Sequence, residues 1–222
     1  MSEAKKIGQN LATIQSQIAS AAQRSRRDAS AITLVAVTKS VGLDEIRILR
    51  DLGITHFGEN RVDIAREKIE TLSDTSLTWH MIGNVQRRKA KEVLQLFDTI
   101  DAIDRISLAA TLQRHGEGED RLCRGLVEVN VSGEAQKHGF SPDNLAEGLA
   151  EITAMDRIQI DGLLTMAPYT ADREALMALF GTLRTLAEAF RLPVVSMGMS
   201  RDFEEAIEAG ATQVRIGRSL FA

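Results

Sequence analysis

The stretch "ITLVAVTKS", Ile32 to Ser40, decides between two α/β folds. It begins as an apolar, β-branched run typical of a buried parallel strand and ends in polar residues that include Lys39. A doubly wound dinucleotide-binding sheet places the pattern G-x-G-x-x-G directly after its first strand. This chain continues instead as "VGLDEIRILRDLG", which has no such loop. The stretch therefore favours a closed (β/α)8 barrel over an open sheet.

Strands and helices alternate along the rest of the chain, and this supports the barrel. Short β-branched runs recur at 32–38, 54–57, 78–82, 97–103, 125–131, 158–164, 193–197 and 212–216. Segments with helical spacing separate them, and two of these end on glycine, at Gly53 and Gly210. Such repetition predicts parallel strands joined by right-handed crossovers. About eight units within 222 residues fit a small TIM barrel.

An additional helix is predicted before the first strand, over roughly Ser2 to Arg24. One helical face is formed by Ile7, Leu11, Ile14 and Ile18. No linker rich in proline, glycine or serine divides the chain, which has only three prolines. We therefore expect one α/β domain over residues 1–222, a (β/α)8 barrel with an extra N-terminal helix.

Composition excludes several classes of protein. With 44% hydrophobic and 26% charged residues, the chain is typical of soluble globular proteins. The net charge of -4 gives no reason to expect nucleic acid as a partner. The single cysteine, Cys123, allows neither an intrachain disulfide nor a Cys-x-x-Cys metal site, and its place before a strand suggests an inert thiol. Apolar runs are far shorter than the ~18 residues of a membrane span. No signal peptide is evident, so a cytoplasmic protein is expected.

Lys39 stands where a barrel places its functional residues. Active sites of (β/α)8 barrels lie at the C-terminal ends of the strands, and Lys39 ends the first one. The apolar residues before it would partly desolvate the amine, and a neutral amine can attack a carbonyl carbon to form a Schiff base. A strand-end lysine can equally extend into water. Taken alone, Lys39 is better explained in that second way.

The loops after the seventh and eighth strands resemble a phosphate site. Barrels often bind phosphate there, through backbone N–H groups and a helix N-terminus. "MGMSRDFEEAIEAG" supplies Ser200 at the expected N-cap of a short helix, and "RIGRS" supplies Gly217 followed by Arg218. Such turns also serve ordinary helix capping, so these loops alone leave both interpretations open. With Lys39 across the barrel mouth, however, they suit one ligand that has an aldehyde and a phosphate, and pyridoxal 5'-phosphate (PLP) fits.

Seven stretches together resemble a known family. They are "VAVTKS", "FGENRV", "WHMIGNVQ", "VNVSGEAQKHGF", "GLLTMAPY", "SMGMSRDFEEAIEAGAT" and "VRIGRSLF", in collinear order from about Val35 to Phe221. The chain is similar in these to the pyridoxal phosphate homeostasis protein family, formerly called proline synthetase co-transcribed protein. That family is similar in fold to the N-terminal barrel of alanine racemase. The resemblance implies a single (β/α)8 domain, PLP bound as an internal aldimine, and no established turnover.

The resemblance also implies roles for individual residues. Lys39 matches the lysine that forms the aldimine, and Asn60, in "GEN", matches a polar residue close to the ring. Ser200, in "MGMS", matches a phosphate ligand. Gly217 and Arg218 match positions whose backbone contacts the phosphate. The sequence departs from the family pattern at Arg218, where a small residue is frequent, and in "HMIGNVQRRK", where the family resembles "HxIGxLQxNK".

Arg215, in "RIG", matches the arginine that faces the pyridine nitrogen. An arginine is always protonated and cannot accept a proton from a pyridinium, so the cofactor there would be a weak electron sink. The alternative is a strand arginine in a surface ion pair. A racemase also needs a second acid–base group opposite the lysine, and the only tyrosine, Tyr169, is at least as well explained by packing or a rim position. No second domain that would supply such a group is expected, and no catalytic residue is assigned.

Three functions compete. The first is a PLP-binding homeostasis protein that buffers, protects and delivers the cofactor, with apo-forms of PLP-dependent enzymes as candidate partners. The second is a fold-type III amino-acid racemase or decarboxylase. The third is a cofactor-free Schiff-base aldolase, although such enzymes usually place the lysine on a late strand. We favour the first, expect a monomer rather than a dimer, and expect His80 to be a hydrogen-bonded core residue and Glu128 an inward acid that needs a partner.

Overall fold

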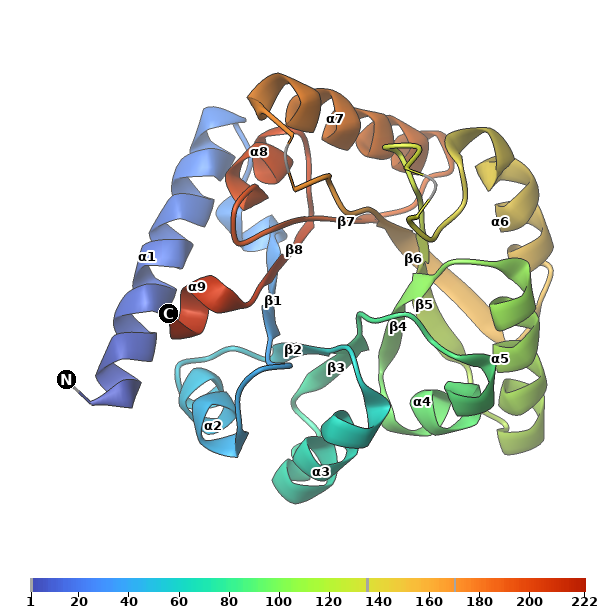
Figure 1. Ribbon diagram of the computed structural model, residues 1–222, viewed down its shortest axis with the longest axis horizontal. Coiled ribbons are helices and arrows are strands. Elements are labelled where there is room, and N and C mark those ends of the chain that lie inside the picture. The colour runs from blue at the N-terminus through green and yellow to red at the C-terminus, as the bar shows by residue number, and fades with distance from the viewer. Residues whose placement is uncertain (1, 135, 170) are drawn as a thin grey trace.

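Eight parallel strands close into a barrel in the computed structural model, which describes residues 2–134, 136–169 and 171–222 (Figure 1). The strands are β1 Thr33–Val37, β2 His56–Glu59, β3 Thr78–Met81, β4 Thr99–Ile103, β5 Cys123–Glu128, β6 Ile158–Leu164, β7 Val194–Met199 and β8 Gln213–Ile216. Each strand pairs with the next along the chain, and β1 also pairs with β8, which closes the barrel. The predicted architecture is confirmed.

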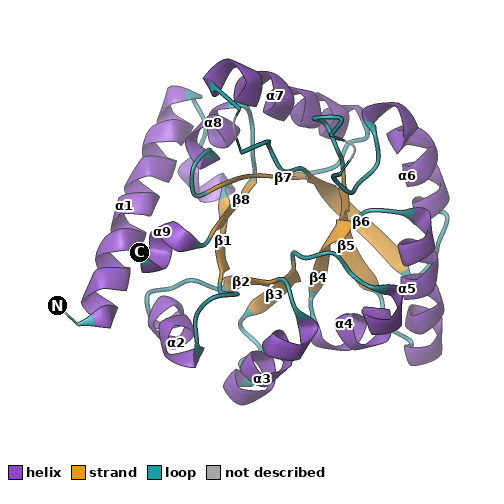
Figure 2. Ribbon diagram, viewed as in Figure 1, coloured by secondary structure: helices purple, strands orange, loops and turns teal. Residues whose placement is uncertain are grey.

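Helices surround the barrel on its outside (Figure 2). They are α1 Glu3–Arg24, α2 Leu43–Asp51, α3 Val62–Leu72, α4 Ala90–Leu96, α5 Ile106–Glu119, α6 Leu145–Thr153, α7 Arg173–Ala189, α8 Phe203–Glu208 and α9 Arg218–Phe221. Short 3-10 turns cover Ala29–Ala31, Arg87–Lys89 and Pro142–Asn144. No helix in the described part of the chain is long and apolar enough to span a bilayer.

The predicted N-terminal helix is present as α1 and packs on the outside of α8 and α9 (Figure 1). The four residues that predicted its apolar face are all buried. The side-chain amide of Asn10 donates to the backbone oxygens of Leu220 and Ala222, each at 3.1 Å. Arg24 pairs with Glu204 on α8 at 2.8 Å. Helix α1 thus fixes the C-terminal segment that carries part of the barrel mouth.

Two strands lie about two residues from their predicted positions. The second strand was expected at 54–57 and covers His56–Glu59, and the fifth was expected at 125–131 and covers Cys123–Glu128. A β-branched run reports side-chain preference, whereas a strand extends only where a neighbour offers backbone partners. Beyond β5 the pairing continues through an isolated bridge between Val129 and Phe140 and through a hydrogen bond from the Val129 N–H to the Leu164 carbonyl at 2.8 Å. Glu59 is thus the last residue of β2.

Candidate functional site

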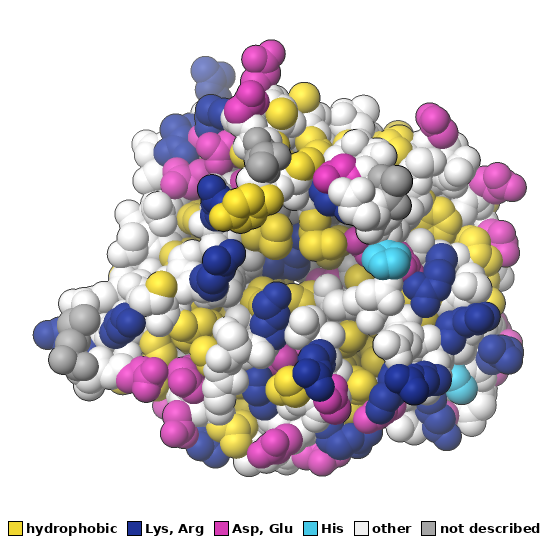
Figure 3. Space-filling model, viewed as in Figure 1, with side chains coloured by type: hydrophobic (Ala, Val, Ile, Leu, Met, Phe, Trp, Pro, Cys, Tyr) yellow, Lys and Arg dark blue, Asp and Glu magenta, His cyan; other side chains and the backbone are white. Residues whose placement is uncertain are grey.

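A cavity of about 480 Å³ opens at the C-terminal ends of the strands. Figure 3 shows it as a hollow over the barrel centre, with Lys and Arg side chains in and around it and apolar side chains on one side. All six residues predicted from the sequence line it: Lys39, Asn60, Ser200, Arg215, Gly217 and Arg218. They come from segments up to 179 positions apart (218 − 39), and barrel closure between β1 and β8 brings them together.

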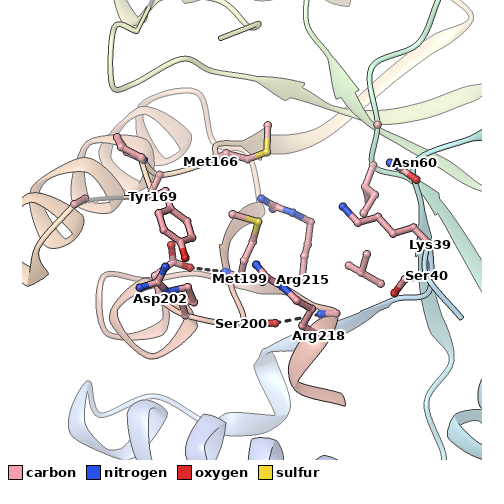
Figure 4. Close-up of a pocket in the computed structure, with 18 of the residues that line it drawn as sticks. Lys39, Ser40, Asn60, Met166, Tyr169, Met199, Ser200, Asp202, Arg215 and Arg218 are labelled. Atoms are coloured by element: carbon pink, nitrogen blue, oxygen red, sulfur yellow. Dashed lines mark hydrogen bonds between the residues drawn. The ribbon is translucent and has the colours of Figure 1, made fainter. Parts of the chain in front are cut away.

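Lys39 is the first pocket residue after β1 and is exposed. It lies in a tight turn in which the N–H of Val41 donates to the carbonyl of Thr38 at 3.1 Å. Its side chain extends into the cavity toward the space that Arg215 also faces (Figure 4). This exposure agrees with the prediction for Lys39 taken alone, a strand-end lysine that extends into water, because the apolar part of β1 ends two residues earlier and the turn carries Lys39 beyond it.

Arg215, on β8, is 4% exposed, so the alternative of a surface ion pair is wrong. Its Nη1 donates to Ser196 Oγ at 2.6 Å and its Nη2 to the Thr165 carbonyl at 2.9 Å. Both acceptors are neutral, and the described residues include no carboxylate within ion-pair distance of it. Burial lowers the pKa of Arg215, although more distant acids such as Asp101 act to raise it. A buried cation paired in this way leaves positive charge for a ligand to neutralise.

A hydrogen-bonded chain inside the barrel holds the acceptor of Arg215 in place. The Gln213 amide nitrogen donates to Ser196 Oγ at 3.0 Å and to Asp101 Oδ2 at 2.8 Å. Because β4 and β8 are not neighbours in the sheet, the bond between Gln213 and Asp101 must cross the barrel interior. Asp101 also contacts His80 Nδ1 at 2.9 Å, so the expected core histidine is confirmed. Burial alone would raise the pKa of Asp101, but His80 and these hydrogen bonds hold it below its usual value.

Ser200 and Gly217 face each other across the two loops predicted to bind phosphate. The N–H of Gly217 donates to Ser200 Oγ at a long 3.4 Å (Figure 4). Gly198 has a positive φ of 88°, and a Cβ there would lie 2.5 Å from Ala206 Cβ, so glycine lets the end of β7 lie against α8. Among the residues that the structure describes, no acceptor takes the hydroxyl proton of Ser200, which can therefore be donated into the cavity.

The predicted N-cap role of Ser200 is wrong. Asp202 occupies the N-cap position of α8, and its Oδ1 accepts from the N–H of Met199 at 2.6 Å. The chain makes a turn from Met199 to Asp202 before the helix begins. This shift removes Ser200 from helix capping and leaves its hydroxyl at the cavity wall.

Asn60 is exposed on the opposite rim, after β2. Its backbone lies against Gly83, where a Cβ would be 2.5 Å from the Asn60 carbonyl oxygen. The glycine of "IGN" therefore allows the loops after β2 and β3 to touch. Next to it, the Asn84 amide donates to Asp104 Oδ2 at 2.8 Å.

Sequence reasoning missed one wall of the cavity. Met166, Tyr169 and Met199 are 40%, 75% and 37% exposed there, among the most exposed large apolar side chains that the structure describes. The Arg201 guanidinium lies 4.1 Å from the centre of the Tyr169 ring. Tyr169 is thus at the rim, as expected. Arg201 could have been found from the sequence, because it directly follows Ser200 at a strand end.

The residues present fit a small anionic ligand with hydrogen-bond acceptors. Lys39, Arg201, Arg215 and Arg218 bring four cationic groups to the cavity lining, against one carboxylate, Asp202. Burial raises the pKa of Asp202 above its usual value. A primary amine on one side and a hydroxyl with backbone N–H groups on the other suit an aldehyde and a phosphate on a single ring. PLP therefore fits the donor set.

Comparison with known proteins agrees with a site whose donors suit PLP. Residues 9–222 match the model of the family described as alanine racemase, N-terminal domain. The pyridoxal phosphate homeostasis protein of Aquifex aeolicus is 36% identical over 219 residues, which cover 96% of each chain. This chain belongs to the pyridoxal phosphate homeostasis protein family.

Solved structures extend the family relationship. PipY of Synechococcus elongatus PCC7942, in a structure with PLP bound, is 32% identical, with a TM-score of 0.83 over 97% of this chain and 100% of PipY. An uncharacterised protein of Bifidobacterium adolescentis gives a TM-score of 0.92 at 29% identity, covering 99% and 96% of the two chains. The fold of this family member is therefore shared by proteins of nearly the same length.

Proposed function

We propose that this chain binds PLP in the cavity at the barrel mouth and serves PLP homeostasis, holding the cofactor and buffering or delivering it within the cell. The observation that carries the proposal is Arg215, a buried cation with neutral partners, in the same cavity as the amine of Lys39. The naming of relatives as pyridoxal phosphate homeostasis proteins and the PipY structure with PLP support it.

In this proposal each part of the ligand has its own residues. Lys39 binds the aldehyde as a Schiff base, and Ser200 donates to the phosphate together with the backbone of Gly217 and Arg218. Arg215 donates to the ring nitrogen, and Asn60 lies on the rim beside the ring. The whole chain, residues 1–222, acts as one PLP-binding domain.

Arg215 sets what the bound cofactor can do. PLP supplies an electron-withdrawing ring whose pull is strongest when the ring nitrogen is protonated. Arg215 offers only donors, and Ser196 and Thr165 fix its orientation. An unprotonated ring nitrogen accepts such a donor, so the site favours the weakly activating form. We infer a carrier without efficient turnover, in preference to a racemase or decarboxylase.

The partners follow from the same argument. Candidate recipients are apo-forms of PLP-dependent enzymes, and neither nucleic acid nor a membrane is required. We expect a monomer, which size-exclusion chromatography with light scattering would test.

The deciding experiment is the visible spectrum of the purified protein before and after borohydride reduction, with peptide mapping of the reduced product. A yellow protein whose cofactor becomes covalently attached at Lys39 supports the proposal. Lys39→Ala should lose the imine absorbance and keep the fold by circular dichroism. A Lys39→Ala protein that keeps an unchanged imine band, or reduction that labels another lysine, would overturn it.

A further inference from the structure

A buried ion pair lies directly beneath the turn that carries Lys39. Lys68, on α3, is 6% exposed, and Glu59, at the end of β2, is fully buried. Lys68 Nζ donates to Glu59 Oε1 at 2.7 Å and also to the carbonyl oxygen of Thr38 at 2.8 Å. The Thr38 hydroxyl donates to the same Glu59 oxygen at 2.7 Å. Through Lys68, helix α3 of the outer ring thus contacts the C-terminal ends of β1 and β2.

These contacts hold every polar atom of the residue before Lys39. The Thr38 N–H donates to the carbonyl of Gly58 at 3.0 Å, and the Thr38 carbonyl accepts from both Val41 and Lys68. The bond from Val41 closes a four-residue turn with Lys39 at its second position. The cluster therefore fixes the backbone position from which the exposed side chain of Lys39 extends.

Stability alone does not account for the cluster. Taking two charges out of water costs free energy that their attraction barely returns, and apolar residues of similar volume are often as stabilising. Moreover, Glu59 Oε2 is buried and has no hydrogen-bond partner among the described residues. A native structure that keeps such an unsatisfied atom calls for a reason other than stability.

We propose that Glu59 and Lys68 are positioning residues for Lys39, which act by clamping Thr38. The inference rests on the proposed function, since it concerns how Lys39 Nζ reaches the aldehyde of PLP. The clamp governs the reaction of the amine and leaves the remaining contacts of the cofactor unaffected. Misplacement of a reacting group by about 1 Å can cost on the order of a hundredfold in rate, so loosening the turn should slow Schiff-base formation.

Two variants separate this role from folding. Thr38→Val removes one hydroxyl of the cluster and keeps the shape. The double variant Glu59→Gln with Lys68→Met removes both charges, so that no unpaired charge is left buried. Thr111→Val is the matched control, because Thr111 is also buried and its hydroxyl donates one hydrogen bond, to the Ser107 carbonyl at 2.8 Å, in α5.

The apo-proteins would be mixed with PLP, and the imine absorbance followed with time. Binding of 4'-deoxypyridoxine 5'-phosphate, in which a methyl group replaces the aldehyde, would be measured by calorimetry. We expect Thr38→Val and the double variant to form the Schiff base more slowly, by about tenfold to a hundredfold, with analogue affinity unchanged. Thr111→Val should match the unaltered protein in the rate of Schiff-base formation and in analogue affinity.

The outcomes are distinguishable. If the unaltered protein forms no Schiff base with PLP, the proposed function fails. If it does and both variants react at its rate, the positioning role is refuted. A parallel loss of analogue affinity in the variants would also refute it, because the cluster would then support the pocket as a whole.

Discussion

Replacing Ser200 by alanine should weaken binding of PLP through its phosphate. Within the described part of the chain the Ser200 hydroxyl accepts one long hydrogen bond, from the N–H of Gly217 at 3.4 Å, and its own proton is available to a ligand. A hydrogen bond to a charged group contributes about 1.5–3 kcal/mol. At 1.4 kcal/mol per decade, the dissociation constant for PLP should rise by about tenfold to a hundredfold. Because the bond within the protein is long, the fold should lose less than ~1 kcal/mol.

The assay is a titration of apo-protein with PLP and, in parallel, with pyridoxal, which lacks the phosphate. The substitution should weaken PLP binding and leave pyridoxal binding unchanged, so that the affinities for the two ligands become more similar. Ser219→Ala is the matched control: it makes the same change two residues after Gly217 at a position that does not line the cavity. If Ser200→Ala weakened the binding of both ligands equally, or left the binding of PLP unchanged, Ser200 would not bind the phosphate.

Three further predictions follow from other groups. Incubation of the PLP-loaded protein with L-alanine in deuterium oxide should give no efficient exchange at the α-carbon, because Arg215 keeps the ring weakly activating; turnover at ~1–1,000 per second would contradict this. Cys123 should resist a thiol reagent such as DTNB at pH 8 until the protein unfolds, since burial raises its pKa to about 12. Burial and the nearby Asp104 raise the pKa of Glu128 in the folded protein. Protonation of Glu128 therefore stabilises the folded state, and the free energy of unfolding should fall as pH rises from the unfolded to the folded pKa value. Glu128→Gln should therefore raise the midpoint of urea unfolding of the apo-protein at pH 7 and lose this advantage in acid; no gain at pH 7 would contradict it.

The sequence alone determined the architecture and the end of the barrel at which the six predicted residues lie. Alternating short apolar runs and helical segments predict a parallel barrel, and the C-terminal ends of all its strands meet on one face. Residues at strand ends, such as Lys39 and Arg215, could therefore be brought to one cavity without knowledge of any contact. Helix α1 was predicted for a similar reason, because its apolar spacing is local.

Tertiary structure decided the environment of these residues. Lys39 could have been desolvated by its strand and is exposed, whereas Arg215 could have been a surface residue and is buried. Ser200 and Asp202 are both good capping residues, and only the turn after β7 decides which of them occupies the cap. Neighbouring sequence reports intrinsic preference, and it cannot report which distant segment covers a side chain.

The interior contacts could not be predicted from the sequence. Lys68 follows a glutamate in an ordinary amphipathic helix and would be placed in solvent, yet it reaches between β1 and β2 to Glu59. Likewise, Gln213 meets Asp101 across 112 residues, through the middle of the barrel. Periodicity specifies which face of an element is buried, but the partner of a buried polar group depends on strand register and helix packing. Both are properties of the closed barrel, formed only when β8 returns to β1.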